Sequence, residues 1–194
     1  MRRLPTEDSD IEGILQLKLL AITAVGFCLL GFAHTAFAVP PDDACNLPQH
    51  LQREISTKYP GSRVVTLSDL EEDDKGFFQK DHGIDCPGLV KVDFYGDGKP
   101  TLAVVLITGD GAKRHTELVL AHKIGEQWRT AQLGTGGGAN PPVVWRQKPG
   151  IYKDIEDGKV IRASRPVIVF CGYESWAILY SWTGKGVDKI WLAD

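Results

Sequence analysis

The run Leu102–Thr108, with the sequence LAVVLIT, is apolar in every position except its last. A continuous apolar run of this length is typical of a strand that is buried on both faces in the middle of a sheet. Asp97-Gly98 lies shortly before it and has the chemistry of a hairpin turn. The chain is therefore expected to fold around a sheet that has Leu102–Thr108 as a central strand.

Other segments carry weaker strand signals, either β-branched residues or alternating apolar and polar residues. They cover residues 63–67, 89–94, 117–123, 127–133, 160–161, 167–170, 177–182 and 189–192. A helix is expected over residues 47–58, because Leu51, Ile55 and Tyr59 recur with helical spacing. The acidic stretch 69–75 is interpreted as a loop or one helical turn. These patterns predict an α+β fold, with one N-terminal helix packed on an antiparallel sheet of about seven strands.

Residues 1–38 have the pattern of a secretory signal peptide. Basic residues precede the apolar run Leu19–Phe32, and Ala36-Phe37-Ala38 follows it as a cleavage site. An uncleaved membrane anchor is the alternative, but a run of about 14 residues is short for a spanning helix, which needs about 20. We expect residues 39–194 to form a single globular domain that is periplasmic or secreted, with no membrane attachment after cleavage.

Charge and glycine patterns argue against two common classes of ligand. The chain carries a net charge of −3, which gives no electrostatic signature of nucleic-acid binding. The segment Gly134–Ala139 fits a G-x-G-x-x-A pattern, but Asn140-Pro141-Pro142 follows it. A dinucleotide site needs a helix at that point, so the segment is interpreted as a surface loop.

Three cysteines remain after the expected cleavage, namely Cys45, Cys86 and Cys171. In an exported protein two of them are expected to pair, although the sequence allows three pairings. We favour Cys86 with Cys171, because both lie at the ends of expected strands. Cys45 would then be the odd cysteine near the new N-terminus.

The segment Asp93–Ala103, with the sequence DFYGDGKPTLA, is the most specific local pattern in the chain. It resembles the D-x-N-G-D-G-x-x-D-x-A calcium loop of FG-GAP and VCBS repeats, which occur in extracellular proteins. The likeness covers 11 residues and occurs once, whereas in that family the loop belongs to one blade of a β-propeller. A plain glycine-rich hairpin turn is the alternative interpretation of this segment.

The resemblance implies which residues would bind calcium. Asp93 and Asp97 match loop positions 1 and 5, Lys99 supplies the backbone carbonyl of position 7, and Thr101 stands at position 9. The family has an oxygen donor at position 3, where this chain has Tyr95. Calcium takes six to eight oxygen ligands, so the expectation is either no cofactor or weakly bound calcium.

Asp81, His82 and Asp85 place two carboxylates and an imidazole beside Cys86. Carboxylate and imidazole groups perform general acid and base catalysis when they converge on a substrate. A hydrolase that uses these three residues is therefore one hypothesis. Structural or surface roles are the alternative, because the partners in catalytic sites usually come from distant segments.

Aromatic residues lie with strand periodicity near the C-terminus. Trp176, Tyr180 and Trp182 share one face of an expected strand. They are interpreted either as core residues beneath the helix or as a partly exposed platform for a sugar or protein partner.

No convergent nucleophile, base and metal set is visible in the sequence. The leading hypothesis is therefore an exported domain without catalysis that binds an unknown protein or carbohydrate partner. The hydrolase and a calcium-stabilised structural module remain as alternatives.

Overall fold

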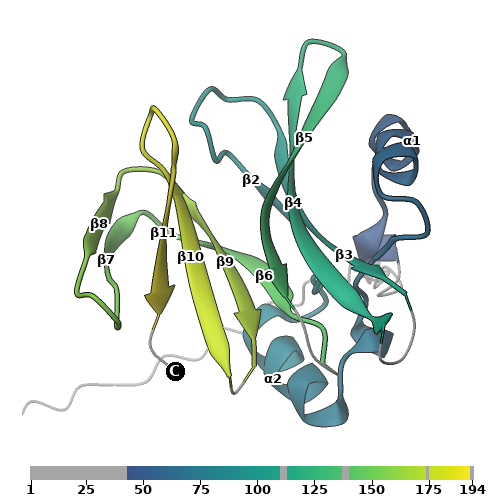
Figure 1. Ribbon diagram of the computed structural model, residues 1–194, viewed down its shortest axis with the longest axis horizontal. Coiled ribbons are helices and arrows are strands. Elements are labelled where there is room, and N and C mark those ends of the chain that lie inside the picture. Colours follow the sequence, from purple (N-terminus) through teal and green to yellow (C-terminus); the bar gives the residue numbers. More distant parts are fainter. Residues whose placement is uncertain (1–42, 110–112, 137–139, 174, 193–194) are drawn as a thin grey trace, which may run out of the picture. The chain divides into compact units, whose positions relative to one another are not determined.

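The apolar run predicted as a buried strand forms β3 (Thr101–Thr108), and every residue of β3 except Thr108 is buried. In this computed structural model, β3 pairs with β4 (His115–Ile124) along one edge. Its other edge pairs with β1 (Arg63–Val64) at one end and with β2 (Leu89–Val92) at the other. β5 (Gln127–Gly136) extends the sheet beyond β4. These five antiparallel strands form sheet A (Figure 1).

The structure describes residues 43–192 apart from 110–112, 137–139 and 174, all within one compact unit, Ala38–Asp194. The expected signal peptide, residues 1–38, lies outside the described residues, and so does part of the glycine-rich segment. Within the described ranges, no helix is both long enough and apolar enough to cross a membrane.

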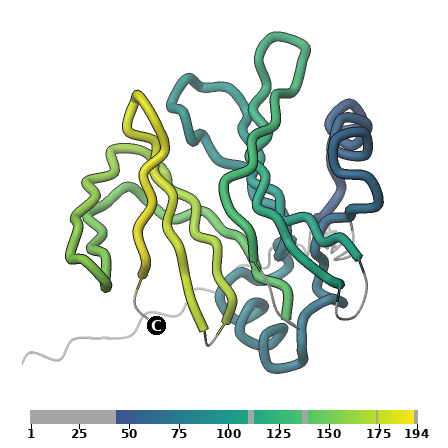
Figure 2. The backbone as a smooth tube through the Cα atoms, in the orientation of Figure 1, coloured from purple at the N-terminus to yellow at the C-terminus, as the bar shows by residue number. Residues whose placement is uncertain are grey.

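The remaining described strands form a second sheet and a separate hairpin. Sheet B has the order β11 (Val187–Leu192), β10 (Trp176–Trp182), β9 (Val167–Gly172) and β6 (Val143–Gln147), all antiparallel. The hairpin pairs β7 (Gly150–Lys153) with β8 (Val160–Ala163). Figure 2 traces the backbone through both sheets, with sheet B in green to yellow and sheet A in teal to green.

Strand alternation divides the core into two layers. One face of β3 carries Ala103, Val105 and Ile107, which belong to the larger cluster together with Phe170 of sheet B. The opposite face packs against α1 (Gln49–Lys58), whose buried residues are Leu51 and Ile55. Sheet A is therefore covered by sheet B on one face and by α1 on the other, which explains why β3 is apolar throughout.

The α+β class is confirmed, but the expected arrangement of one helix on a single sheet of about seven strands is wrong. The described residues contain eleven strands in three sheets, two α-helices and two short 3-10 helices, η1 (Asp43–Cys45) and η2 (Leu67–Asp69). Both faces of sheet A are apolar, so sheet B covers one of them and α1 covers the other.

The second helix, α2 (Glu72–His82), replaces most of the loop expected over residues 69–75. Three acidic residues occupy its first turn, where they interact favourably with the helix dipole. Gly83 ends the helix with a φ of 64°, a left-handed conformation that glycine adopts without strain.

The expected disulfide between Cys86 and Cys171 is also wrong. Cys45 pairs with Cys86, with a Cα–Cα distance of 5.1 Å. Cys171 is buried in β9 and lies outside this disulfide. The pairing follows from the fold, because the sulfur atoms of Cys45 and Cys86 lie 3.7 and 3.6 Å from the same carbonyl oxygen, that of Val65.

Candidate functional site

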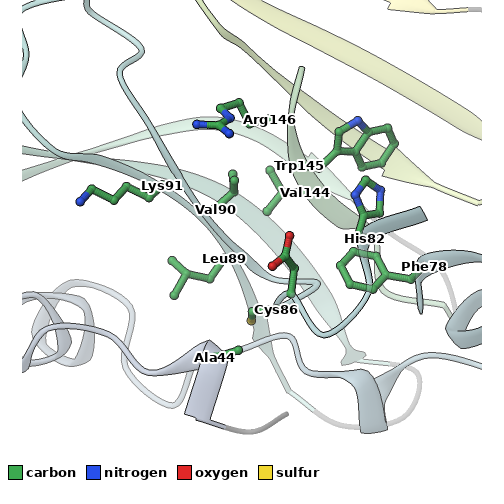
Figure 3. A pocket seen from close by; sticks show the side chains of 11 residues that line it. Ala44, Phe78, His82, Cys86, Leu89, Val90, Lys91, Val144, Trp145 and Arg146 are labelled. Atoms are coloured by element: carbon green, nitrogen blue, oxygen red, sulfur yellow. The ribbon is translucent and has the colours of Figure 1, made fainter. Parts of the chain in front are cut away.

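A pocket of about 330 Å³ lies where α2, β2 and β6 meet, and we name it the α2 pocket. It is lined by residues of all three elements and by the segment after α2, including Phe78, His82, Asp85, Lys91, Trp145 and Arg146 (Figure 3). The lining therefore combines aromatic rings, two cations and a carboxylate. This mixture of flat apolar surface and a few polar groups is characteristic of ligand sites.

The pocket exists because the edges of sheets A and B meet at one point. The amide of Val144 in β6 donates a hydrogen bond of 2.8 Å to the carbonyl of Pro87, just before β2. Beyond this contact, the segments Leu89–Lys91 and Val144–Arg146 line the pocket together. Cys86 also lines it, so the disulfide to Cys45 fixes one wall covalently.

The aromatic wall of the pocket is a row of three rings. His82 lies between Phe78 and Trp145, with ring centroids 4.8 and 5.1 Å away (Figure 3). Phe78 is buried and anchors the row, whereas Trp145 is only half-buried. A ligand in the pocket can therefore contact the Trp145 ring. The His82 ring packs against the Trp145 ring and holds its orientation.

The charged side chains of the pocket are exposed. Asp85, Lys91 and Arg146 take part in none of the ion pairs between the residues that the structure describes. Figure 3 shows Lys91 and Arg146 on the side of the pocket away from Phe78. Together they offer donors and an acceptor to a polar ligand that stacks on the aromatic wall.

The structure brings together only two members of the predicted catalytic cluster. His82 and Asp85 line the α2 pocket, but Asp81 does not. Asp81 is exposed. The pKa of Tyr173 is raised first by burial and then by the charges of Cys171, Asp81 and Asp74. No hydrogen bond or ion pair joins the side chains of His82 and Asp85, both of which are described.

The four residues of the expected calcium loop lie in different surroundings. Thr101 is fully buried, and its hydroxyl lies 2.9 Å from Nδ1 of His122. Asp97 lies 3.2 Å from Nε2 of the same imidazole and accepts a hydrogen bond from the Lys99 amide. Asp93 is exposed and lines a neighbouring pocket. His122 therefore binds two of the side chains that were expected to bind calcium.

The electrostatics of Asp97 follow from these neighbours. Desolvation raises the pKa of Asp97, but the Lys99 amide and the charges of His122 and Lys99 outweigh it and hold this pKa below its usual value. In the described part of the chain, no three His, Cys, Asp or Glu side chains form a group that could hold a metal ion. Calcium binding stays a prediction.

The predicted aromatic platform points mainly into the protein. Tyr180 is 3% exposed, and its hydroxyl lies against Gly134 of sheet A. Trp176 packs on Phe170, with a centroid distance of 5.0 Å. Trp182 packs on Tyr95 at 5.0 Å and lines a separate pocket beside His122. These aromatic residues therefore fill the space between the two sheets, not the space beneath α1.

Lys91, Trp145 and Arg146 line the α2 pocket but were not predicted from the sequence. Trp145 and Arg146 follow His82 by more than 60 positions, and only the meeting of β2 and β6 brings these segments together. No local motif marks them. Comparison of the chain with protein-family models, curated proteins and solved structures found no match.

Proposed function

We propose that this protein is an exported binding domain without catalysis, and that the α2 pocket binds a carbohydrate. The observation that carries the proposal is the half-buried Trp145, which packs on His82 and lines one pocket with Asp85, Lys91 and Arg146. An aromatic face covers the apolar side of a sugar ring, while charged groups bond to its hydroxyls. The disulfide supports the exported location, because disulfides form and persist in oxidising compartments.

The proposal is tested by screening the exported protein against a panel of immobilised oligosaccharides and titrating the best ligand by calorimetry. Trp145→Ala is expected to abolish binding while the fold is retained, because the ring is only half-buried. Ile151→Ala is the matched control, since Ile151 is 66% exposed and lines none of the pockets described above. Equal binding by Trp145→Ala and the wild-type protein would refute the site.

A hydrolase at the same pocket is the second candidate, because His82 and Asp85 line it together. Both groups could exchange protons with a bound substrate. Incubation with the best ligand, followed by an assay for new reducing ends, separates the two candidates. Products that disappear in Asp85→Asn, at an unchanged melting temperature, would establish hydrolysis. Binding without products supports the binding domain.

A further inference from the structure

The α2 pocket continues into two further pockets of about 360 Å³ each. The first shares Lys91 and Arg146 with the α2 pocket, and the second shares Lys91 and Pro100 with the first. Lys91 therefore lines all three. The three pockets therefore adjoin one another at Lys91, and we name them together the β2 groove.

The charges of the β2 groove balance once Asp97, the partner of Lys99, is counted. Its cations are Lys91, Lys99, Lys123 and Arg146, and its carboxylates are Asp85, Asp93 and Glu126. Within the α2 pocket, two cations, Lys91 and Arg146, accompany one carboxylate, Asp85, so this pocket is positive although the chain as a whole has a net charge of −3. Lys99 lies 3.8 Å from Asp97, whereas the other three cations take part in no ion pair between described residues.

Both ends of the groove contain a tryptophan. Trp145 lines the α2 pocket, and Trp128 lines the far pocket beside Pro100 and Lys123. Trp128 is 9% exposed, so the far end offers only the rim of its ring. The strong stacking surface is thus at the α2 end, and the cations continue from there along the groove.

From these features we propose that the ligand of the β2 groove is an anionic glycan chain built from uronic acid units; this inference rests on the proposed function. The uronate carboxylates face Lys91 and Arg146, and one sugar ring stacks on Trp145. The groove's own carboxylates accept hydrogen bonds from sugar hydroxyls. An acidic peptide fits less well, because it offers few hydroxyl donors to the three carboxylates and no sugar ring to stack on Trp145.

The test compares binding of hexagalacturonate and of neutral maltohexaose to the exported protein by calorimetry at low and high salt. We expect the acidic chain to bind at least about tenfold more tightly at low salt and to lose most of this preference at high salt. Digalacturonate should bind more weakly than hexagalacturonate, because it spans less of the groove.

Substitutions of single cations test which residues cause the preference for the acidic chain. Lys91→Gln and Arg146→Gln should each weaken hexagalacturonate binding about tenfold and leave maltohexaose binding unchanged. Lys185→Gln is the control, because this exposed lysine lies in the turn between β10 and β11 and lines none of the three pockets. Circular dichroism melts verify that each variant is folded.

The outcomes separate this inference from the proposed function. Equal affinity for the acidic and neutral chains would overturn the inference while the carbohydrate site stands. Binding of neither chain, together with tight binding of a polyglutamate peptide, would overturn both. Preferential binding of hexagalacturonate that depends on Lys91 and Trp145 supports both.

Discussion

The imidazole of His122 lies 3.2 Å from the carboxylate of Asp97. The other nitrogen of the ring pairs with the hydroxyl of Thr101, so one side chain of β4 joins the end of the loop to the first residue of β3. Tyr95 covers the ring, with a centroid distance of 4.4 Å. The loop that resembles a calcium site is therefore closed by a protein side chain.

Replacing His122 should destabilise the protein. His122→Ala removes both interactions and leaves the fully buried Thr101 hydroxyl without its partner, which costs about 1–3 kcal/mol in the free energy of unfolding. Urea denaturation at neutral pH measures this difference. His115→Ala is the control on the same strand: His115 is exposed, and its removal should change stability by less than about 0.5 kcal/mol.

Calcium should have little effect on the melting temperature of the wild-type protein. Asp97 and Thr101 are both engaged by His122, so two of the expected ligands would have to exchange partners before a cation could bind. Melts in EDTA and in millimolar calcium should agree within about 1 °C, since only a ligand of the native state shifts the transition. A rise of several degrees that Asp97→Ala removes would restore the calcium interpretation.

Asp154 should make stability depend on pH in the acidic range. Its carboxylate accepts the Trp191 amide at 2.8 Å and the amides of Glu156 and Asp157, and these bonds hold the pKa of Asp154 below its usual value. A lowered native pKa adds stability above the unfolded pKa of about 3.9, which is lost as the pH falls through the native value. Asp154→Asn should therefore melt several degrees lower at pH 7.

The same pair of proteins provides the pH test. The difference in melting temperature between wild type and Asp154→Asn should shrink as the pH falls below about 4. Glu156→Gln, an exposed acid of the same turn, is the control and should show no such trend. A melting-temperature difference that stays constant down to about pH 2 would exclude the Asp154 carboxylate as its source.

The disulfide should be a major source of stability. It closes a loop of 41 residues between Cys45 and Cys86, and the chain-entropy estimate for that loop is about 4 kcal/mol. The double variant Cys45→Ala/Cys86→Ala should lose stability of this order in urea denaturation. Peptide mapping without reductant should recover the Cys45–Cys86 pair, and a Cys86–Cys171 peptide would contradict the structure.

A side chain at Gly134 should destabilise the protein unless Tyr180 is shortened. A Cβ atom at Gly134 would collide with the Tyr180 hydroxyl, so Gly134→Ala should cost about 1–3 kcal/mol in unfolding free energy. Tyr180→Phe removes the colliding atom, and the double variant should recover part of the loss. Additive effects in this double-mutant cycle would show that the two residues do not meet.

Those elements were predictable from the sequence in which the spacing of apolar residues matches the buried positions. The run in β3 is apolar because sheet B and α1 cover both of its faces, and the spacing of Leu51 and Ile55 marked α1. α2 was missed because its inward positions are Asp74, Phe78 and His82, a face with one apolar residue. Helical periodicity of apolar residues is therefore absent from α2.

The α2 pocket depends on contacts that no local sequence pattern indicates. Asp81 and Asp85 look equivalent in the sequence, yet only Asp85 lines the α2 pocket. Arg146 and Lys91 belong to edge strands of different sheets, which meet where the Val144 amide bonds to the Pro87 carbonyl. The cysteine pairing failed for the same reason, because it depends on where η1 lies and not on strand ends.

The disulfide also determines how the domain would respond to mechanical load. Both helices and β1 lie in the covalent loop between Cys45 and Cys86. Tension applied to the chain before Cys45 passes through the sulfur bridge to Cys86 and then to β2, so the intervening loop bears none of it. A pulling experiment on the oxidised protein should therefore extend the chain by the full length minus this loop, and the missing length should appear only after reduction.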